Sequence, residues 1–183
     1  MQKDTHPSTK ALFLDRDGII NIDHGYVYQI EDFEFMKDIF TLAKLFSDAD
    51  YKIFVVTNQS GIGRGYYTLD DFKKLSHWMK EQFSLHRLEI SHIYYCPHAP
   101  EEKCHCRKPE IGMMEQCLAQ YDIDLTKAWM IGDKQSDIDF AHQANIKHTI
   151  AIREKSIQKA DYFFHSISEC KRYLEENQGK IHL

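Results

Sequence analysis

Two aspartates spaced two residues apart, Asp15 and Asp17, follow a short apolar run and precede Gly18. Side chains at positions i and i+2 of an extended chain point the same way, so the two carboxylates are expected to lie close together. Two like charges at that separation are costly unless they share a proton or a cation, and Mg2+ prefers such oxygen ligands. The motif predicts a metal and catalytic site after a strand, with an Asp-rich turn as the alternative.

A second group of residues is suited to phosphate. Thr57 ends the apolar run 53–57 and is followed by the glycine-rich stretch 58–65. Hydroxyl and backbone amide donors can surround an anion, so the segment predicts phosphate binding, with a solvated loop as the alternative. Lys108 adds a fixed positive charge that could hold a phosphoryl group during transfer, although most lysines are surface residues.

A third group follows the apolar run that ends at residue 131. Asp133 offers a further carboxylate for Mg2+, and Asp137 lies one helical turn later, where it could orient a metal-bound water or Lys134. The alternative for Asp137 is a carboxylate that stabilises a helix N-terminus. Each of these polar groups follows the end of an expected strand. Because ligands of parallel sheets bind beyond the carboxyl ends of the strands, we expect the groups to converge.

Three cysteines and a histidine crowd into the segment 96–106. The set is Cys96, His98, Cys104 and Cys106, and it has the spacing C-x-H-x5-C-x-C. Three thiolates and one imidazole form a closed tetrahedral Zn2+ site of the structural kind. His105 is a weaker rival for His98, because a ligand between two ligand cysteines would be cramped. A reduced, metal-free cluster is the remaining alternative, and Cys117 and Cys170 fall in helical patterns as packing residues.

Hydrophobic periodicity alternates between strand and helix along the whole chain. The expected strands are 11–14, 53–57, 92–95, 128–131, 148–152 and 162–164, and the expected helices are 39–47, 69–85, 111–121, 136–144 and 168–176. Such alternation predicts an α/β fold with a doubly wound, mostly parallel sheet. We expect one domain, residues 1–183, interrupted by an inserted zinc loop at 96–109.

Composition excludes several classes of protein. The formal net charge is −5 and there is no basic tract, which argues against a nucleic-acid binder. No apolar run approaches the roughly 20 residues of a membrane span, and the first residues lack the apolar core of a signal peptide. We therefore expect a cytoplasmic protein without a membrane or nucleic-acid partner, acting as a monomer on a small molecule.

The order of these motifs resembles the haloacid dehalogenase (HAD) superfamily of phosphotransferases. Its four-part signature is Asp-x-Asp-Gly, a strand-end Thr or Ser, a Lys, and Gly-Asp-x-x-x-Asp, and the resemblance covers about residues 10–165. It implies that Asp15 is a nucleophile that forms an aspartyl-phosphate, and that Asp17 is the general acid and base. It further implies Mg2+ held by the Asp15 carboxylate, the Asp17 backbone carbonyl and Asp133, with Thr57 and Lys108 on the phosphoryl oxygens.

The zinc loop, ending in Cys-x-Cys-Arg-Lys-Pro, is similar to that of a small capless, Rossmannoid branch of this superfamily. The branch contains D-glycero-D-manno-heptose 1,7-bisphosphate phosphatases and histidinol-phosphate phosphatases. Segments 21–27, 58–65 and 94–98 resemble the heptose enzymes. That resemblance implies a substrate site formed by Asp23, His24, Gly25, Tyr26, Asn58, Gln59, Ser60, Arg107 and Lys134.

The two members of the branch differ in their expected substrates. The heptose resemblance implies release of the C7 phosphate from the sugar bisphosphate, giving heptose 1-phosphate for ADP- or GDP-heptose, precursors of lipopolysaccharide and surface glycans. The alternative is a histidinol-phosphate phosphatase of histidine biosynthesis, because the five residues between His98 and Cys104 resemble the short loop of that group. Segments 23–26 and 59–65 favour the heptose.

Overall fold

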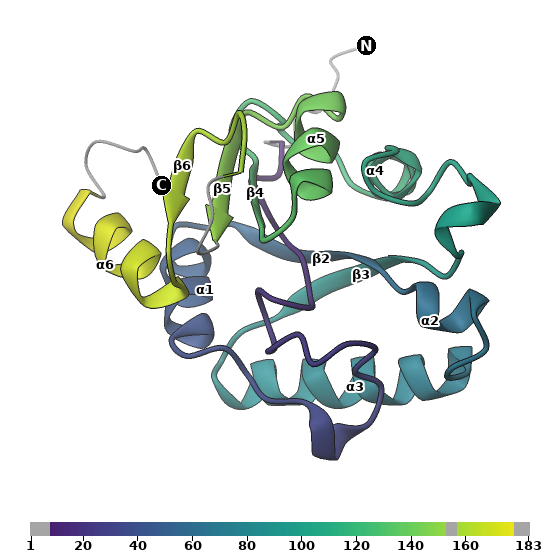
Figure 1. The fold of residues 1–183 in the computed structure, drawn as a ribbon. Helices are drawn as coiled ribbons and strands as arrows, with labels where there is room; N and C mark the ends of the chain where they lie inside the picture. Colours follow the sequence, from purple (N-terminus) through teal and green to yellow (C-terminus); the bar gives the residue numbers. More distant parts are fainter. Residues whose placement is uncertain (1–7, 153–156, 178–183) are drawn as a thin grey trace, which may run out of the picture.

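The computed structural model describes residues 8–152 and 157–177, and its centre is a six-stranded parallel sheet (Figure 1). The strands are β1 (Ala11–Leu14), β2 (Lys52–Asn58), β3 (Ile90–Cys96), β4 (Trp129–Gly132), β5 (His148–Ile152) and β6 (Tyr162–Phe164). Their order is β3-β2-β1-β4-β5-β6, and every neighbouring pair is parallel. The expected α/β class and parallel sheet are confirmed.

Strand β1 lies at the centre of the sheet and fixes the position of its functional end. It pairs with β2 on one side and β4 on the other, and all four of its residues are fully buried. Burial on both faces explains why the strand is a continuous apolar run without polar alternation. The strand order reverses between β1 and β4, so a crevice opens beyond their carboxyl ends, where ligands of such sheets bind.

Helices cover both faces of the sheet (Figure 1). They are α1 (Ile39–Asp48), α2 (Ser60–Gly63), α3 (Leu69–Leu85), α4 (Gly112–Gln120), α5 (Gln135–Gln143) and α6 (Ile167–Asn177), with 3-10 turns at Ile30–Asp32 and Pro100–Glu102. Side chains of α1, α3 and α6 pack with Leu12 and Leu14 in one apolar cluster. Those of α4 and α5 pack with Ala11 and Phe13 in another. The two clusters follow from the alternation of side chains along β1.

Local sequence signals account for most helix boundaries. Helix α3 begins after Thr68, whose hydroxyl accepts from the Asp71 amide while the Asp71 carboxylate accepts from the Thr68 amide. This capping box satisfies two donors that would otherwise have no partner. The expected elements match the observed ones within about two residues at each end. The exception is α2, which the glycine-rich stretch 58–65 did not suggest.

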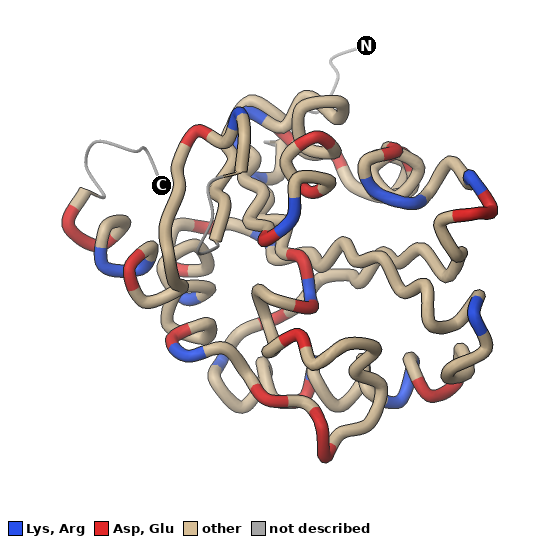
Figure 2. Tube along the Cα trace, viewed as in Figure 1, with Lys and Arg blue, Asp and Glu red and all other residues tan. Residues whose placement is uncertain are grey.

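Charged residues of both signs are interspersed along the described trace (Figure 2). The positive charge at the crevice therefore comes from individual residues and not from a basic face. None of the helices in the described part of the chain has both the length and the apolar character that a membrane crossing requires.

Candidate active site

A buried ion cluster lies at the carboxyl end of β1. The Lys108 ammonium contacts the Asp15 carboxylate at 2.9 Å, the Asp137 carboxylate at 2.6 Å and the Val56 carbonyl oxygen at 2.7 Å. All three charged side chains are nearly inaccessible to solvent. Three acceptors match the three hydrogens of an ammonium, so the position and charge of Lys108 are fixed. Asp137 pairs with this lysine, and its other oxygen accepts from the backbone amides of residues 133 and 134.

The electrostatics of the cluster favour a further cation. Burial raises the pKa of Asp15, and Asp137 raises it further, although Lys108 opposes both effects. Burial alone would lower the pKa of Lys108, but the two carboxylates raise it overall. Two carboxylates and one ammonium leave one uncompensated negative charge in a site with little water.

Replacing Lys108 by methionine is expected to destabilise the fold, because two buried carboxylates then lose their shared partner. Removal of one member of a buried ion pair typically costs about 3–5 kcal/mol. Urea denaturation of Lys108→Met should show a loss of that size in the free energy of unfolding. Lys44→Met provides the control, since Lys44 pairs with Asp48 at the exposed surface of α1 and should cost less than about 1 kcal/mol. Equal losses in the two variants would contradict the cluster's role.

Asp15, Asp133 and Asp137 offer carboxylate oxygens that all lie within 4.8 Å of one another. Because both oxygens of Asp137 are engaged, Asp15 and Asp133 are the side chains best suited to a divalent ion. Gly18 has a positive φ of 95°, and any Cβ at this position would collide with the Asp133 carboxylate. The glycine after the Asp-x-Asp motif therefore turns the chain and also makes room for the carboxylate from β4. The oxygen donors fit Mg2+.

The Asp17 carboxylate is held from both sides. Its Oδ1 accepts from the Arg16 guanidinium at 2.7 Å and from Asn21 Nδ2 at 3.0 Å, and its Oδ2 accepts from Gln59 Nε2 at 3.0 Å. Arg16 is buried and also donates to the Val27 carbonyl oxygen. The orientation of Asp17 is thus fixed by three side chains. One of them, Arg16, also links Asp17 to the backbone at Val27.

The polar residues at the end of β2 mainly organise their neighbours. Thr57 Oγ1 accepts from Gln59 Nε2 at 2.8 Å, and both residues are almost fully buried. The side-chain amide of Asn58 forms two hydrogen bonds with the backbone of Lys108, at 3.0 and 3.1 Å. Asn58 therefore anchors the loop that carries the lysine. These contacts add a positioning function to the substrate contacts expected of Asn58 and Gln59.

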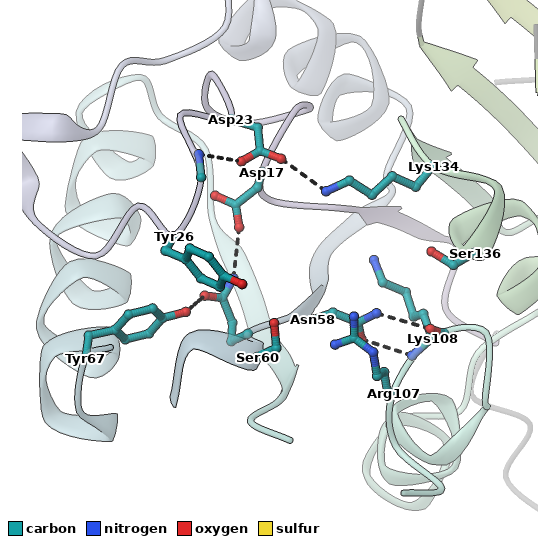
Figure 3. Close-up of a pocket in the computed structure, with 12 residues that line it drawn as sticks. Asp17, Asp23, Tyr26, Asn58, Ser60, Tyr67, Arg107, Lys108, Lys134 and Ser136 are labelled. Carbon is teal, nitrogen blue, oxygen red and sulfur yellow. Dashed lines mark hydrogen bonds and ion pairs between the residues drawn. The ribbon is translucent and has the colours of Figure 1, made fainter. Parts of the chain in front are cut away.

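A cavity of about 330 Å3 opens over these groups (Figure 3). It is lined by Asp17, Asp23, Gly25, Tyr26, Asn58, Gln59, Ser60, Tyr67, Arg107, Lys108, Lys134 and Ser136. The volume falls in the range of small-molecule sites. The structure thus brings together nearly all residues expected to bind substrate. His24 is the exception: its side chain is half exposed, and its ring lies 3.8 Å from Glu34 outside this lining.

Lys134 and Asp23 form an ion pair of 3.1 Å at the cavity, although they come from distant parts of the chain. Burial opposes the charge of each group, but Lys134 keeps the pKa of Asp23 low, and Asp15, Asp133 and Asp23 together keep the pKa of Lys134 high. Arg107 Nη1 is buried and has no hydrogen-bond partner among the described residues. The cavity therefore offers cationic donors suited to an anion.

Sequence reasoning missed several residues of the site. Tyr67 and Ser136 line the cavity, and Arg16 and Asn21 hold Asp17. Arg16 is the middle residue of the Asp-x-Asp motif and Asn21 follows Asp17 by four residues, so their closeness to the motif in the sequence was a usable signal. Tyr67 follows a turn after α2, and nothing in its local pattern indicates where its hydroxyl lies.

The cysteine segment brings its four predicted ligands together. The Cys96 Sγ lies 3.4 Å from Cys104 Sγ and 3.6 Å from His98 Nδ1, and Cys106 Sγ lies 3.2 Å from the same nitrogen. A disulfide would need about 2.05 Å, whereas tetrahedral ligands about 2.3 Å from Zn2+ lie about 3.8 Å apart. The spacing and the donor set fit zinc. His105 contacts Glu115 at 2.8 Å instead, away from the cluster.

The fold is shared with solved structures. A D,D-heptose 1,7-bisphosphate phosphatase from B. bronchiseptica, complexed with magnesium and phosphate, matches with a TM-score of 0.82 at 24% identity. The match covers 92% of this chain and 99% of that one. A family model described as HAD-hydrolase-like matches residues 105–169. The sheet order and the carboxylates at the ends of β1 and β4 are thus those of a HAD-like hydrolase.

Sequence relatives define the family within that class. The chain is 46% identical over 169 residues to the D-glycero-beta-D-manno-heptose-1,7-bisphosphate 7-phosphatase of Helicobacter pylori, covering 92% of this chain and 95% of that protein. It is 44% identical over 170 residues to the corresponding alpha-anomer 7-phosphatase of Campylobacter jejuni, covering 92% and 97%. The chain belongs to the family of heptose-1,7-bisphosphate 7-phosphatases.

Proposed function

We propose that the chain is a Mg2+-dependent phosphatase that removes the C7 phosphate of D-glycero-D-manno-heptose 1,7-bisphosphate and leaves heptose 1-phosphate. The observation that carries the proposal is the cavity itself, whose lining combines the carboxylates of Asp17 and Asp23 with the cationic groups of Arg107, Lys108 and Lys134. A bisphosphate needs two anion sites, one at the reacting carboxylate and one at a distance from it. The product would supply ADP- or GDP-heptose for surface glycans.

In the proposed mechanism Asp15 attacks phosphorus in line and forms an aspartyl-phosphate. Asp17 donates a proton to the leaving sugar oxygen and then takes one from the water that hydrolyses the intermediate. The Thr57 hydroxyl donates to a phosphoryl oxygen, and Lys108 supplies a fixed positive charge beside Asp15. Mg2+, held by Asp15, Asp133 and the Asp17 backbone carbonyl, would supply charge that offsets the repulsion between nucleophile and ester.

The second phosphate is assigned to Arg107, one of the basic groups that line the cavity. Arg107 has a buried guanidinium nitrogen without a partner among the described residues, and a bound phosphate would satisfy it. Lys134 lies on the same cavity and is held by Asp23. Asp23 and Tyr26 would then contact the sugar between the two phosphates. This arrangement favours a bisphosphate over histidinol phosphate, which carries a single phosphate.

The cysteine cluster is proposed to bind structural Zn2+ through Cys96, His98, Cys104 and Cys106. Because the loop continues directly into Arg107 and Lys108, zinc would fix the residues that complete the cavity. Free thiols at this density suit a reducing compartment, which agrees with a cytoplasmic location. The protein is proposed to act as a monomer in one domain.

The test is phosphate release in the presence of Mg2+, measured on heptose 1,7-bisphosphate and on histidinol phosphate. A kcat/KM at least about a hundredfold higher for the bisphosphate is expected, corresponding to about 2.7 kcal/mol from the second phosphate site. Phosphorus NMR of the product should retain the anomeric phosphate signal. A preference for histidinol phosphate would overturn the proposed substrate but would leave the proposed mechanism in place.

A further inference from the structure

A tyrosine outside the expected site is connected to Asp17 through one buried amide. The Tyr67 hydroxyl donates to Gln59 Oε1 at 2.6 Å. The amide nitrogen of Gln59 donates in turn to Asp17 Oδ2 at 3.0 Å and to Thr57 Oγ1 at 2.8 Å. Figure 3 draws one of these hydrogen bonds from the Tyr67 hydroxyl and another from the Asp17 carboxylate as dashed lines. Tyr67 is thus linked to Asp17 indirectly, through the side chain of Gln59.

The hydrogen bonds determine which way the Gln59 amide points. The Tyr67 hydroxyl donates to the amide oxygen, so the amide nitrogen lies on the other side and faces Asp17 Oδ2 and Thr57 Oγ1. A flipped amide would turn its oxygen toward Asp17 and its nitrogen toward the tyrosine. The Tyr67 hydroxyl therefore stabilises the one orientation in which Gln59 donates to both Asp17 and Thr57.

The Tyr67 ring is itself fixed in place. It stacks on the ring of Tyr28 at a centroid distance of 5.2 Å and an interplanar angle of 8°. On its other side it lies against Gly61, where any Cβ would collide with the ring. Burial raises the pKa of Tyr67 to about 12, so the phenol keeps its proton at neutral pH and remains a donor. The residue is 6% exposed and cannot change its partner without moving the segment 59–67.

We propose that Tyr67 is a positioning residue that orients Asp17 for proton transfer to the leaving group, acting through the amide of Gln59. The proposal rests on the proposed function, because it takes Asp17 as the proton donor. It predicts that loss of the Tyr67 hydroxyl weakens proton donation much more than it weakens binding of the phosphoryl group. The effect must therefore depend on how strongly the leaving group needs a proton.

The experiment compares Tyr67→Phe with wild type on two phosphate monoesters. The sugar bisphosphate releases an alkoxide that requires protonation, whereas p-nitrophenyl phosphate releases a stable phenolate that does not. General acid catalysis contributes a factor of about 10²–10⁴ to the rate. We expect Tyr67→Phe to lower kcat/KM on the sugar ester by about tenfold. The loss on the aryl ester should be less than about twofold, because kcat/KM reports the steps up to departure of the leaving group.

Tyr66→Phe is the matched control, since it removes the neighbouring hydroxyl from a half-exposed ring that packs on Tyr26. It should keep wild-type kinetics on both esters. A second test is a double-mutant cycle with Gln59→Leu. If Tyr67 acts through Gln59, then Tyr67→Phe should cost less than about twofold once Gln59 has been replaced. Equal losses on both esters, no loss on either, or additive losses in the cycle would overturn the proposal.

Failure of the substrate assignment gives a different pattern. A wild-type enzyme inactive on the heptose bisphosphate but active on another sugar phosphate would overturn the proposed function. The comparison of Tyr67→Phe would then use that sugar phosphate against the same aryl ester. A leaving-group-dependent loss there would support the role of Tyr67, and a uniform loss would overturn it.

Discussion

Replacing Asp15 by asparagine is expected to abolish phosphate release, with a fall in kcat on the order of 10⁴-fold or more, as for other catalytic nucleophiles. An amide keeps the shape of the side chain but cannot attack phosphorus to form a stable acyl phosphate. Stability should be maintained or raised, because burial and Asp137 both disfavour the charge on Asp15. The measurement is phosphate release on the sugar bisphosphate together with a thermal melt.

The control for this prediction is Asp48→Asn on helix α1, where the carboxylate is exposed and pairs with Lys44. It should keep wild-type kcat and lose less than about 1 kcal/mol. Residual activity of Asp15→Asn above about one percent of wild type would point to a different nucleophile. A lost melting transition would instead show that Asp15 is needed for folding.

Replacing Cys104 by serine is expected to remove bound zinc and to lower Tm by about 10 °C. Zinc coordination contributes folding free energy directly, and about 3 kcal/mol lost in a protein of this size gives a shift of that order. Phosphate release should fall as well, since the loop positions Arg107 and Lys108. The measurements are zinc content by atomic absorption, a thermal melt and kcat. A strong chelator added to wild type should reproduce the loss of stability.

His105 provides the matched control, because it lies between two predicted ligands but contacts Glu115 at the surface. His105→Ala should retain one zinc per chain, whereas His98→Ala should lose it. If both histidine variants kept the metal, or if zinc removal changed neither Tm nor kcat, the assignment of the loop would be wrong.

The strand–helix architecture was predictable because its signals are local. Fully apolar runs of four residues, such as 11–14 and 128–131, are typical of strands buried on both faces, and a capping pair at Thr68 marks the start of α3. Helix α2 was not predictable, because four residues rich in glycine have little helical propensity. It forms since the ends of the segment are anchored by Gln59 and Tyr67.

The site was predictable where spacing along the chain implies proximity in space. Asp15 and Asp17 are separated by a single residue. Asp133 follows another parallel strand, and the carboxyl ends of parallel strands lie at the same edge of the sheet. The partners of these residues were not predictable. That Asp137 pairs with Lys108, or that Asn58 holds the lysine backbone, depends on how a loop after β3 folds back over β2. Such contacts depend on tertiary packing, which the pattern of neighbouring residues in the sequence does not reveal.

The pairing of β1 with β4 has a consequence for when catalysis becomes possible. Leu12 is paired with Trp129, so the two carboxylates of the proposed metal site come from opposite halves of the chain. Contacts between residues so distant in sequence form slowly and late. During synthesis on the ribosome, β1, β2 and β3 emerge well before β4, and the early chain has no metal pair to attack a phosphate ester. Phosphatase activity would therefore appear only after β4 docks, which makes it a direct reporter of that docking step.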